Sequence, residues 1–410
     1  MKIYCIAGEA SGDMHGAALL QEIRRRYPAA TLRGWGGYLM EAEGMYLVRH
    51  YRETAFMGFV EVVRNLGNIL RLLRDARADI RTYAPDLLIL IDYPGFNLRM
   101  ARFAKRLGIK VVYYISPQLW AWKEGRIQTV RDCVDQMLCI LPFEQDWYAQ
   151  RGVSVHYVGH PLADRVRPCS PAQRLGHREA LSANSPMPTT SPWVALLPGS
   201  RLQEIRKHLP IMLKTVRSMQ GIVAAVAMAP GVNSSVYHDI LKECGIALTN
   251  GHRKILLTDC TRDLLASADA ALVASGTATL EAALLDCPMV AVYKVNPLSY
   301  WLGKALVKVP YVSLVNLILN REVIPERLQG LMSPSVLSVD LKALLPSSDG
   351  SMRSDAKAQQ EAFAELRNVL VPVSDTEDTS VALTASSRAV FYMQQAGLLA
   401  EHPVRTTCSS

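Results

Sequence analysis

The side chain best placed for acid–base chemistry is Asp92, which follows the apolar run Leu87–Ile91 and precedes Tyr93 and Pro94. If this run is a strand of a parallel sheet, its carboxyl end lies at the edge where such sheets bind ligands. Partial burial there would raise the pKa of the Asp92 carboxyl group toward the range that suits a general base. Asp92 is therefore the candidate catalytic residue. The alternative is an Asx-turn in which Asp92 only shapes the chain before Pro94.

A glycine-rich loop after the first apolar run, Lys2–Ala7, is a second candidate site. The loop covers Gly8–Asp13, and we expect Ser11 and Gly12 to contact an oxygen-rich ligand at the N-terminus of the following helix. Its glycines recur every four residues, which is not the Gly-x-Gly-x-x-Gly spacing of dinucleotide-binding proteins. The spacing therefore disfavours a dehydrogenase. The alternative is a tight turn in which Ser11 or Asp13 caps the helix.

A similar turn follows the run Trp193–Leu197 and carries Gly199, Ser200 and Arg201. An arginine beside the free N–H groups of a helix N-terminus is well suited to a diphosphate. The alternative is an arginine that only faces solvent in a capped turn. We predict that Gly199, Ser200 and Arg201 bind substrate.

The run Ala270–Val273 leads into the small residues Ser275, Gly276 and Thr277, and then to Glu281. Small residues leave the N-terminus of the following helix open to a phosphate group. A carboxylate about one and a half turns further along can accept hydrogen bonds from both hydroxyls of a ribose. The alternative for Glu281 is a favourable interaction with the helix dipole alone.

Neither a metal nor a cofactor is expected. The chain contains no Asp-x-Asp pair, the arrangement that commonly holds a diphosphate through a divalent metal. Its eight cysteines are scattered, without Cys-x-x-Cys or zinc spacing, and suit reduced thiols in a reducing cytosol.

The composition is that of a folded globular protein long enough for two domains, with 410 residues, 50% of them hydrophobic. The net charge of +8 at pH 7 is compatible with phosphate-bearing or lipid ligands. No nucleic-acid-binding signature accompanies this charge, so no nucleic-acid partner is expected. No apolar stretch reaches the ~18 residues that span a bilayer, and the run Lys2–Ala7 is too short for a signal peptide. We therefore expect a protein that is not integral to a membrane.

These candidate residues must be positioned by an alternation of apolar runs and helical patterns. Nearly continuous Val, Ile and Leu runs indicate parallel strands that are covered on both faces. We expect strands at Lys2–Ala7, Thr31–Trp35, Asp86–Asp92, Lys110–Ser116, Gln136–Leu141, Val155–Val158, Trp193–Leu197, Ile222–Met228, Lys254–Leu257, Ala270–Val273 and Met289–Tyr293. The repeated strand–helix order predicts the α/β class, with two doubly wound Rossmann-like domains facing across a cleft.

We expect the first domain over residues 1–167 and the second over 193–345. Residues 168–192, which are rich in Ser and Pro and poor in periodicity, are predicted to be a linker. Residues 346–410 are predicted to form a tail with helices that pack back on the first domain or on a partner subunit.

An apolar stripe over residues 59–74 is a candidate membrane-binding surface. Arg64, Arg71 and Arg74 border the stripe, as in a helix that lies at a membrane interface. The alternative is the ordinary core-facing stripe of a surface helix. The residues predicted to contact the membrane are Val60, Val63, Leu66, Ile69 and Leu70.

Seven motifs, in this order, resemble the lipid-A-disaccharide synthases, which are inverting glycosyltransferases of the GT-B type. The resemblance extends from Met1 to about Leu345 and covers the tail poorly. The motifs are Gly8–Asp13, Ile91–Asn97, Ile115–Trp122, Leu141–Glu144, Leu197–Arg201, Ala274–Glu281 and Tyr311–Asn316.

The resemblance implies a transfer from UDP-2,3-diacylglucosamine to 2,3-diacylglucosamine 1-phosphate through a β-1,6 bond, which gives the lipid A disaccharide 1-phosphate and UDP. It implies that the first domain binds the acceptor, with Asp92 as the base, and that the second binds the UDP-sugar through Arg201, Glu281 and Asn316. The family usually has Asp where Gly95 stands. This chain lacks a carboxylate at that position, so such a group cannot take part in catalysis here.

The resemblance also implies a peripheral location on the cytoplasmic face of the inner membrane, in lipopolysaccharide synthesis, and a homodimer that can exchange C-terminal segments. Two alternatives stay open. One is another UDP-sugar enzyme of the same fold, either a lipid-linked N-acetylglucosamine transferase or a UDP-sugar 2-epimerase. The other is a non-catalytic lipid- or nucleotide-binding protein.

Overall fold

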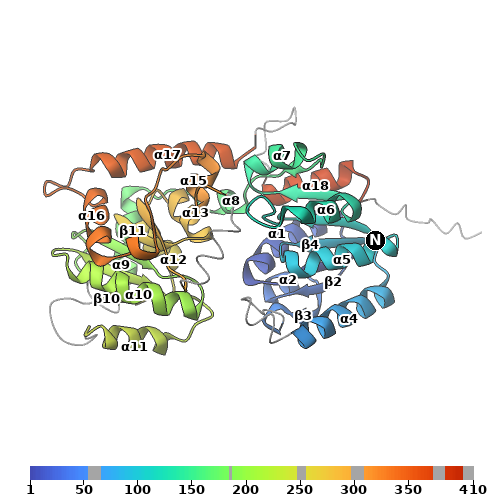
Figure 1. Ribbon diagram of the computed structural model, residues 1–410, viewed down its shortest axis with the longest axis horizontal. Helices are drawn as coiled ribbons and strands as arrows, with labels where there is room; N and C mark the ends of the chain where they lie inside the picture. Colours follow the sequence, from blue (N-terminus) through green and yellow to red (C-terminus); the bar gives the residue numbers. More distant parts are fainter. Residues whose placement is uncertain (54–65, 184–186, 247–254, 297–308, 373–383, 400–410) are drawn as a thin grey trace, which may run out of the picture. The chain divides into compact units, whose positions relative to one another are not determined.

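The protein is described by a computed structural model, which covers residues 1–53, 66–183, 187–246, 255–296, 309–372 and 384–399. The chain divides into two compact units (Figure 1). The first consists of Met1–Asp164 together with Val371–Ser410, and the second of Arg165–Leu370. Each unit is built on a parallel sheet of its own.

The sheet of the first unit has the strand order β3-β2-β1-β4-β5-β6-β7, with every pair parallel. Its strands are β1 Lys2–Ala7, β2 Thr31–Gly36, β3 Tyr46–His50, β4 Leu87–Ile91, β5 Lys110–Tyr114, β6 Gln136–Cys139 and β7 His156–Tyr157. The helices of this unit are α1 Ala10–Arg26, α2 Tyr38–Ala42, α4 Leu66–Tyr83, α5 Pro94–Arg106, α6 Ile127–Cys133, α7 Pro142–Ala149 and α18 Ala385–Gln395, with short 3-10 turns η1 Tyr51–Glu53 and η2 Glu124–Arg126.

The sheet of the second unit has the order β10-β9-β8-β11-β12-β13, again with every pair parallel. Its strands are β8 Trp193–Leu197, β9 Val223–Ala227, β10 Ile255–Thr258, β11 Ala270–Ala274, β12 Met289–Tyr293 and β13 Glu326–Leu328. The helices are α9 Pro171–Ser182, α10 Leu202–Arg217, α11 Ser234–Glu243, α12 Thr261–Ser267, α13 Thr277–Leu284, α15 Leu314–Leu319, α16 Pro334–Leu344 and α17 Ser354–Leu370, with the 3-10 turn η3 Gln329–Leu331. Helix α8, Pro161–Arg165, spans the boundary between the units.

Every expected strand is present, and no strand end differs from its expected position by more than two residues. The sequence did not predict two strands, β3 and β13, and both lie at an edge of their sheet. No residue of either strand is fully buried. Their sequences, Tyr-Leu-Val-Arg-His and Glu-Arg-Leu, lack the continuous apolar run of the central strands. The faces of these two edge strands are only partly covered, so they need no continuous apolar run.

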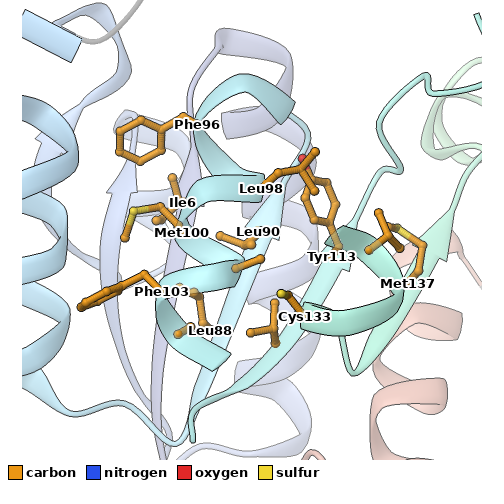
Figure 2. Packing of buried hydrophobic residues seen from close by; sticks show 14 of the residues in the cluster. Ile6, Leu88, Leu90, Phe96, Leu98, Met100, Phe103, Tyr113, Cys133 and Met137 are labelled. Carbon is orange, nitrogen blue, oxygen red and sulfur yellow. The ribbon is translucent and has the colours of Figure 1, made fainter. Parts of the chain in front are cut away.

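The core of the first unit holds α5 on the sheet. Figure 2 shows Leu88 and Leu90 of β4 beneath Phe96, Met100 and Phe103 of α5. All five side chains are buried, and each contributes about 1.5–3 kcal/mol of hydrophobic stabilisation. This packing fixes where β4 ends and α5 begins, and so fixes the turn between them.

The segment predicted as a linker, 168–192, is instead part of the second unit, and it contains α9. The N–H of Gln173 donates to the Ser170 hydroxyl, and the Gln173 side chain accepts from the N–H of Ser170, which forms a capping box. Arg178 of α9 is almost fully buried and pairs with Asp269 at 2.7 Å. The same Asp269 carboxylate accepts from the N–H of Trp193 at the start of β8. The linker prediction is therefore wrong.

The tail is divided between the two units. Helix α17 packs against α13 and α16, and the side chain of Gln359 bonds both the N–H and the carbonyl of Met289 at the start of β12. The expectation that the tail's helices pack on the first domain or on a partner subunit is therefore wrong for α17. Helix α18 packs against α1, and Arg388 donates to the carbonyl of Val158 at 3.2 Å.

Candidate functional site

In each sheet the strand order reverses at one point, between β1 and β4 in the first unit and between β8 and β11 in the second. At such a reversal the loops after neighbouring strands run in opposite directions and leave a crevice at the carboxyl ends of the strands. In the first unit these loops begin with Gly8 and with Asp92 and Tyr93. The two loops lie in close contact at Gly8 and Tyr93. A Cβ atom added to Gly8 would lie only 2.4 Å from the Tyr93 ring. Only glycine permits this close approach.

Asp92 sits in a strained turn that is held by buried hydrogen bonds. Asp92 and Tyr93 both have left-handed backbones, with φ of 45° and 50°, which costs non-glycine residues about 1–3 kcal/mol each. The carbonyl of Asp92 accepts from the Asn97 side-chain amide at 2.7 Å and from the Tyr113 hydroxyl at 2.6 Å. The Asn97 amide also reaches the carbonyl of Ile91 at 3.2 Å. These bonds hold the turn in the strained conformation that follows β4.

The Asp92 carboxyl group is tuned by its surroundings. Burial raises its pKa to about 6, because a partly dry site penalises the charged form, while the N–H of Tyr93 opposes the shift by bonding the carboxylate. At pH 7 the group is therefore mostly ionised and is ready to accept a proton. A perturbed carboxyl group at the reversal point of a parallel sheet is the arrangement expected of an active-site base.

The first glycine loop has a more structural role than the sequence suggested. Ser11 is exposed in the first turn of α1, whereas Gly12 is buried against Ala7. The carboxylate of Asp13 accepts from the N–H groups of Gly37, Leu39 and Met40, with the shortest bond at 2.7 Å. Asp13 therefore caps α2, not its own helix. Of the two predicted contact residues in this loop, only Ser11 is exposed to a ligand.

The buried carboxylate of Glu144 organises the loop after β5. Both this loop and Glu144 belong to motifs of the family resemblance, but no role was predicted for their residues. Both Ser116 and the Trp120 indole N–H donate to Oε1 of Glu144, and the N–H of Leu141 donates to its Oε2 at 3.0 Å. Burial raises the pKa of Glu144 to about 7, although these donors oppose the shift. The loop that begins at Ile115, another residue with a left-handed backbone, is thereby fixed next to Asp92.

In the second unit, Gly199, Ser200 and Arg201 follow β8 and lead into α10. Gly199 has φ of 121°, and a Cβ atom there would lie 2.5 Å from the Glu204 carboxylate. That carboxylate accepts from the N–H of Ser200 at 3.2 Å and pairs with the Arg201 guanidinium at 3.6 Å. Arg201 remains 57% exposed. The pair is long and the Arg201 side chain is largely exposed, so this ion pair contributes little to stability.

Ser275, Gly276 and Thr277 follow β11, the strand paired with β8. Gly276 and Thr277 are exposed at the N-terminus of α13, whereas the Ser275 hydroxyl donates to the carbonyl of Val312 at 2.9 Å. Glu281 is a turn further along, and its Oε1 accepts from Arg262 at 2.7 Å. Arg262 therefore fixes one oxygen of the Glu281 carboxylate, and no residue of the described ranges donates a hydrogen bond to the other.

Asn316 lies in α15 of the second unit. Its side chain is 0% exposed, and its amide N–H groups donate to the carbonyl of Ile324 and to Glu326. Its oxygen accepts from the N–H groups of Val323 and Ile324. All of its hydrogen-bonding capacity is thus used inside the protein. In this structure the Asn316 side chain shapes the loop before β13, and the predicted contact of this residue with UDP stays a prediction.

His208 is a site residue that sequence reasoning missed. It lies on the buried face of α10, and its Nδ1–H donates to the carbonyl of Pro198 at 2.8 Å. Its Nε2 accepts from the N–H of Lys294 at 2.9 Å. Burial lowers the pKa of His208, so the ring is neutral and can play both roles. It joins the loop after β8 to the loop after β12. The sequence pointed to this role only through the position of a histidine among the apolar residues of a helix.

The predicted membrane stripe is only partly described. Val60 and Val63 lie outside the described residues, and the side chain of Leu66 is not described. In α4, Leu70 is 59% exposed, and Arg71 and Arg74 are exposed beside it. Ile69 packs against the core, and Leu72 and Leu73 belong to it. Within the described part of the stripe, Leu70 therefore faces solvent, whereas Ile69 and Leu73 face the core.

The described ranges contain neither a membrane-spanning helix nor a metal-binding cluster. No helix there combines the length and apolar character that a membrane crossing requires. Within the same ranges, no three His, Cys, Asp or Glu side chains form a group able to hold a metal ion.

Comparison with known proteins gives the family. A family model described as lipid-A-disaccharide synthetase matches residues 3–377. The lipid-A-disaccharide synthase of Syntrophus aciditrophicus is 40% identical over 372 residues, which cover 90% of this chain and 93% of that protein. That of Alkalilimnicola ehrlichii is 40% identical over 393 residues, which cover 94% and 99%. That of Myxococcus xanthus is 40% identical over 345 residues, which cover 83% and 87%.

Solved structures support the fold. A putative UDP-N-acetylglucosamine 2-epimerase from Listeria monocytogenes aligns with a TM-score of 0.61 at 10% identity, over 98% of each chain. The glycotransferase of kitacinnamycin aligns with a TM-score of 0.58 at 13% identity, over 96% of this chain and 98% of that one. The predicted α/β class with two Rossmann-like domains of GT-B type is confirmed. By its sequence and its fold, this chain belongs to the lipid-A-disaccharide synthetase family.

Proposed function

We propose that the chain joins UDP-2,3-diacylglucosamine to 2,3-diacylglucosamine 1-phosphate through a β-1,6 bond, with inversion at the anomeric carbon and release of UDP. The observation that carries this proposal is the Asp92 carboxyl group, which has a raised pKa and lies at the reversal point of the first sheet. Inversion in one displacement requires one base on the acceptor and stabilisation of negative charge on the leaving UDP.

In the proposed reaction the Asp92 carboxylate takes the proton from the acceptor's 6-hydroxyl group. The oxygen then attacks the anomeric carbon of the donor from the face opposite UDP. The bond from that carbon to the diphosphate breaks, and its electron pair leaves with UDP. The fixed turn at Asp92 supports this role, because a base must be held at hydrogen-bond distance from the hydroxyl that it deprotonates.

The nucleotide belongs to the second unit in this proposal. Arg201 and the exposed N-terminus of α13 at Gly276 and Thr277 neutralise the diphosphate without a metal. The second oxygen of the Glu281 carboxylate accepts from the ribose hydroxyls, while Arg262 holds the first. Ser200 and Gly199 shape the turn that carries Arg201, and His208 holds that turn against the loop after β12.

The direct test is product analysis with both lipid substrates in neutral detergent micelles. UDP should appear only when the acceptor is present, and NMR of the product should show a β-1,6 bond. Excess EDTA should leave the rate largely unchanged. Conversion of UDP-N-acetylglucosamine alone into its 2-epimer would point to an epimerase instead. A rate that EDTA abolishes and magnesium restores would contradict the metal-independent part of the proposal.

Separate substitutions should divide catalysis from nucleotide binding. We expect Asp92→Asn to lower turnover by about 10²–10⁴-fold, the usual contribution of a general base, with little change in UDP affinity. Arg201→Ala should weaken UDP binding about 10- to 100-fold, because it removes charge-assisted hydrogen bonds. The measurements are steady-state kinetics and calorimetric titration with UDP.

Two matched variants control these experiments. Asp86→Asn removes a carboxylate just before the start of β4, and Arg206→Ala removes an exposed arginine from α10. Both should behave like the wild type. Near-normal turnover of Asp92→Asn would reduce Asp92 to a residue that shapes the turn.

We also propose that the exposed face of α4 at Leu70, Arg71 and Arg74 touches the cytoplasmic surface of the inner membrane, where acylated substrates reside. An exposed leucine beside arginines gains from apolar insertion and from attraction to anionic headgroups. Leu70→Ser should reduce sedimentation with phosphatidylglycerol-containing vesicles by roughly threefold to tenfold. Leu175→Ser, at an exposed leucine of α9, is the control. Equal loss in both variants, or none in Leu70→Ser, would contradict the proposal.

A further inference from the structure

Three cationic side chains beside the Asp92 turn have no carboxylate partner among the residues that the structure describes. They are Arg99 of α5, Lys123, and Arg126 of η2. The acidic residue between them, Glu124, pairs with Arg151 at 2.7 Å instead. Elsewhere in this unit an acid neutralises several of the arginines, as Asp79 pairs with Arg33 at 2.6 Å. An unneutralised group of three positive charges therefore needs an explanation.

Contacts within the first unit bring the three side chains to one place. The Arg99 guanidinium folds back on the carbonyl of Gly95, so it lies over the first turn of α5, which starts two residues after Asp92. One turn further along, Arg102 donates to the hydroxyl of Thr129 in α6. This bond ties α5 to the segment that begins with η2. In that segment Lys123 has a left-handed backbone, with φ of 60°, and its ammonium group lies 4.0 Å from the centre of the Trp122 ring.

The three charges act on one another. Burial lowers the pKa of Lys123, and the charges of Arg126 and Arg99 lower it further. Burial also lowers the pKa of Arg126, and the charges of Arg99 and Arg102 add to that effect. Such mutual repulsion destabilises the empty site and is relieved when an anion binds.

The same cluster adjoins the candidate base. The Tyr113 hydroxyl donates to the Asp92 carbonyl, and the charges of both Asp92 and Arg126 act on this tyrosine, one raising and the other lowering its pKa. The positive N-terminus of α5 points to the same turn. A Cβ atom added to Gly95 would meet nothing within 4 Å, so the first turn of α5 is open to a ligand.

We propose that Arg99, Lys123 and Arg126 form a phosphate-monoester site, and that it holds the phosphate group of the acceptor while Asp92 faces the acceptor's hydroxyl group. This assignment rests on the proposed function and extends it by naming the residues that recognise the acceptor. Guanidinium groups bind phosphate through paired charge-assisted hydrogen bonds, and lysine adds a point charge. The site would select an acceptor that carries a phosphate over one that lacks it.

The experiment compares Arg126→Gln and Arg99→Gln with the wild type in neutral detergent micelles. Two acceptors are used, 2,3-diacylglucosamine 1-phosphate and the same sugar without its phosphate. We expect each variant to raise KM for the phosphorylated acceptor about 10- to 100-fold, with no change in KM for the donor or for the unphosphorylated acceptor. Arg106→Gln, which removes an exposed arginine from the far end of α5, should match the wild type.

A second measurement does not depend on turnover. Glucosamine 1-phosphate should raise the thermal unfolding temperature of the wild type and of Asp92→Asn, and glucosamine should not. The shift should be lost in Arg126→Gln. This result would stand even if the lipid substrates gave no disaccharide, so the two proposals can fail separately.

Three results would overturn the anion site. One is an equal change in KM for both acceptors, and another is a change confined to the UDP-sugar, which would assign the charges to the donor diphosphate. The third is weaker binding to anionic vesicles with unchanged acceptor KM, which would assign them to lipid headgroups.

Discussion

The candidate active site of the first unit depends on one backbone carbonyl group, that of Asp92. Hydrogen bonds from the Asn97 amide and the Tyr113 hydroxyl hold it, and so maintain two successive left-handed residues that would otherwise relax. Tyr113 belongs to β5 and Asn97 to α5, and the packing of α5 on β4 keeps these donors in place. The Asp92 carboxyl group is thereby kept at the carboxyl end of β4, in surroundings dry enough to raise its pKa. The hydrophobic core and the chemistry are thus linked through a few buried polar contacts.

In the second unit a different kind of residue holds the loops at the carboxyl ends of the strands. There a neutral, buried His208 joins the loop after β8 to the loop after β12, and Asn316 and Glu326 shape the loop that approaches Ser275. These polar groups are bonded inside the protein, so they position the loops, whereas the proposed ligand contacts fall to Arg201, Glu281 and the N-terminus of α13. The division is that expected where rigid buried groups support exposed functional ones.

The central strands could be predicted because runs such as Leu87–Ile91 are continuous and apolar, and the order of strands and helices then fixes the reversal points. The Asp92 and Arg201 turns were found because polar residues follow such runs directly. Helix α9 was not predicted, although Ser170 and Gln173 have the spacing of a capping box. The Ser- and Pro-rich residues that follow the helix favoured the prediction of a linker. The roles of Asn316 and Leu73 could not be predicted, because both depend on which side chains become buried against distant segments. The cluster of Arg99, Lys123 and Arg126 could not be predicted either, since it depends on the packing of α5 against the segment that contains η2 and α6.

The central claim is that the Asp92 carboxylate is the base, and the pH dependence of kcat/KM for the acceptor tests it most directly. Because this ratio reports the ionisation of the free enzyme and of the free substrate, the profile must be corrected for the acceptor phosphate, which itself titrates. After that correction, the rate should fall tenfold per pH unit below about pH 6, the value to which burial raises the Asp92 pKa. Asp92→Asn should show a low rate with no such limb. A wild-type profile that stays flat through pH 6, or an acid limb that survives in Asp92→Asn, would contradict the account.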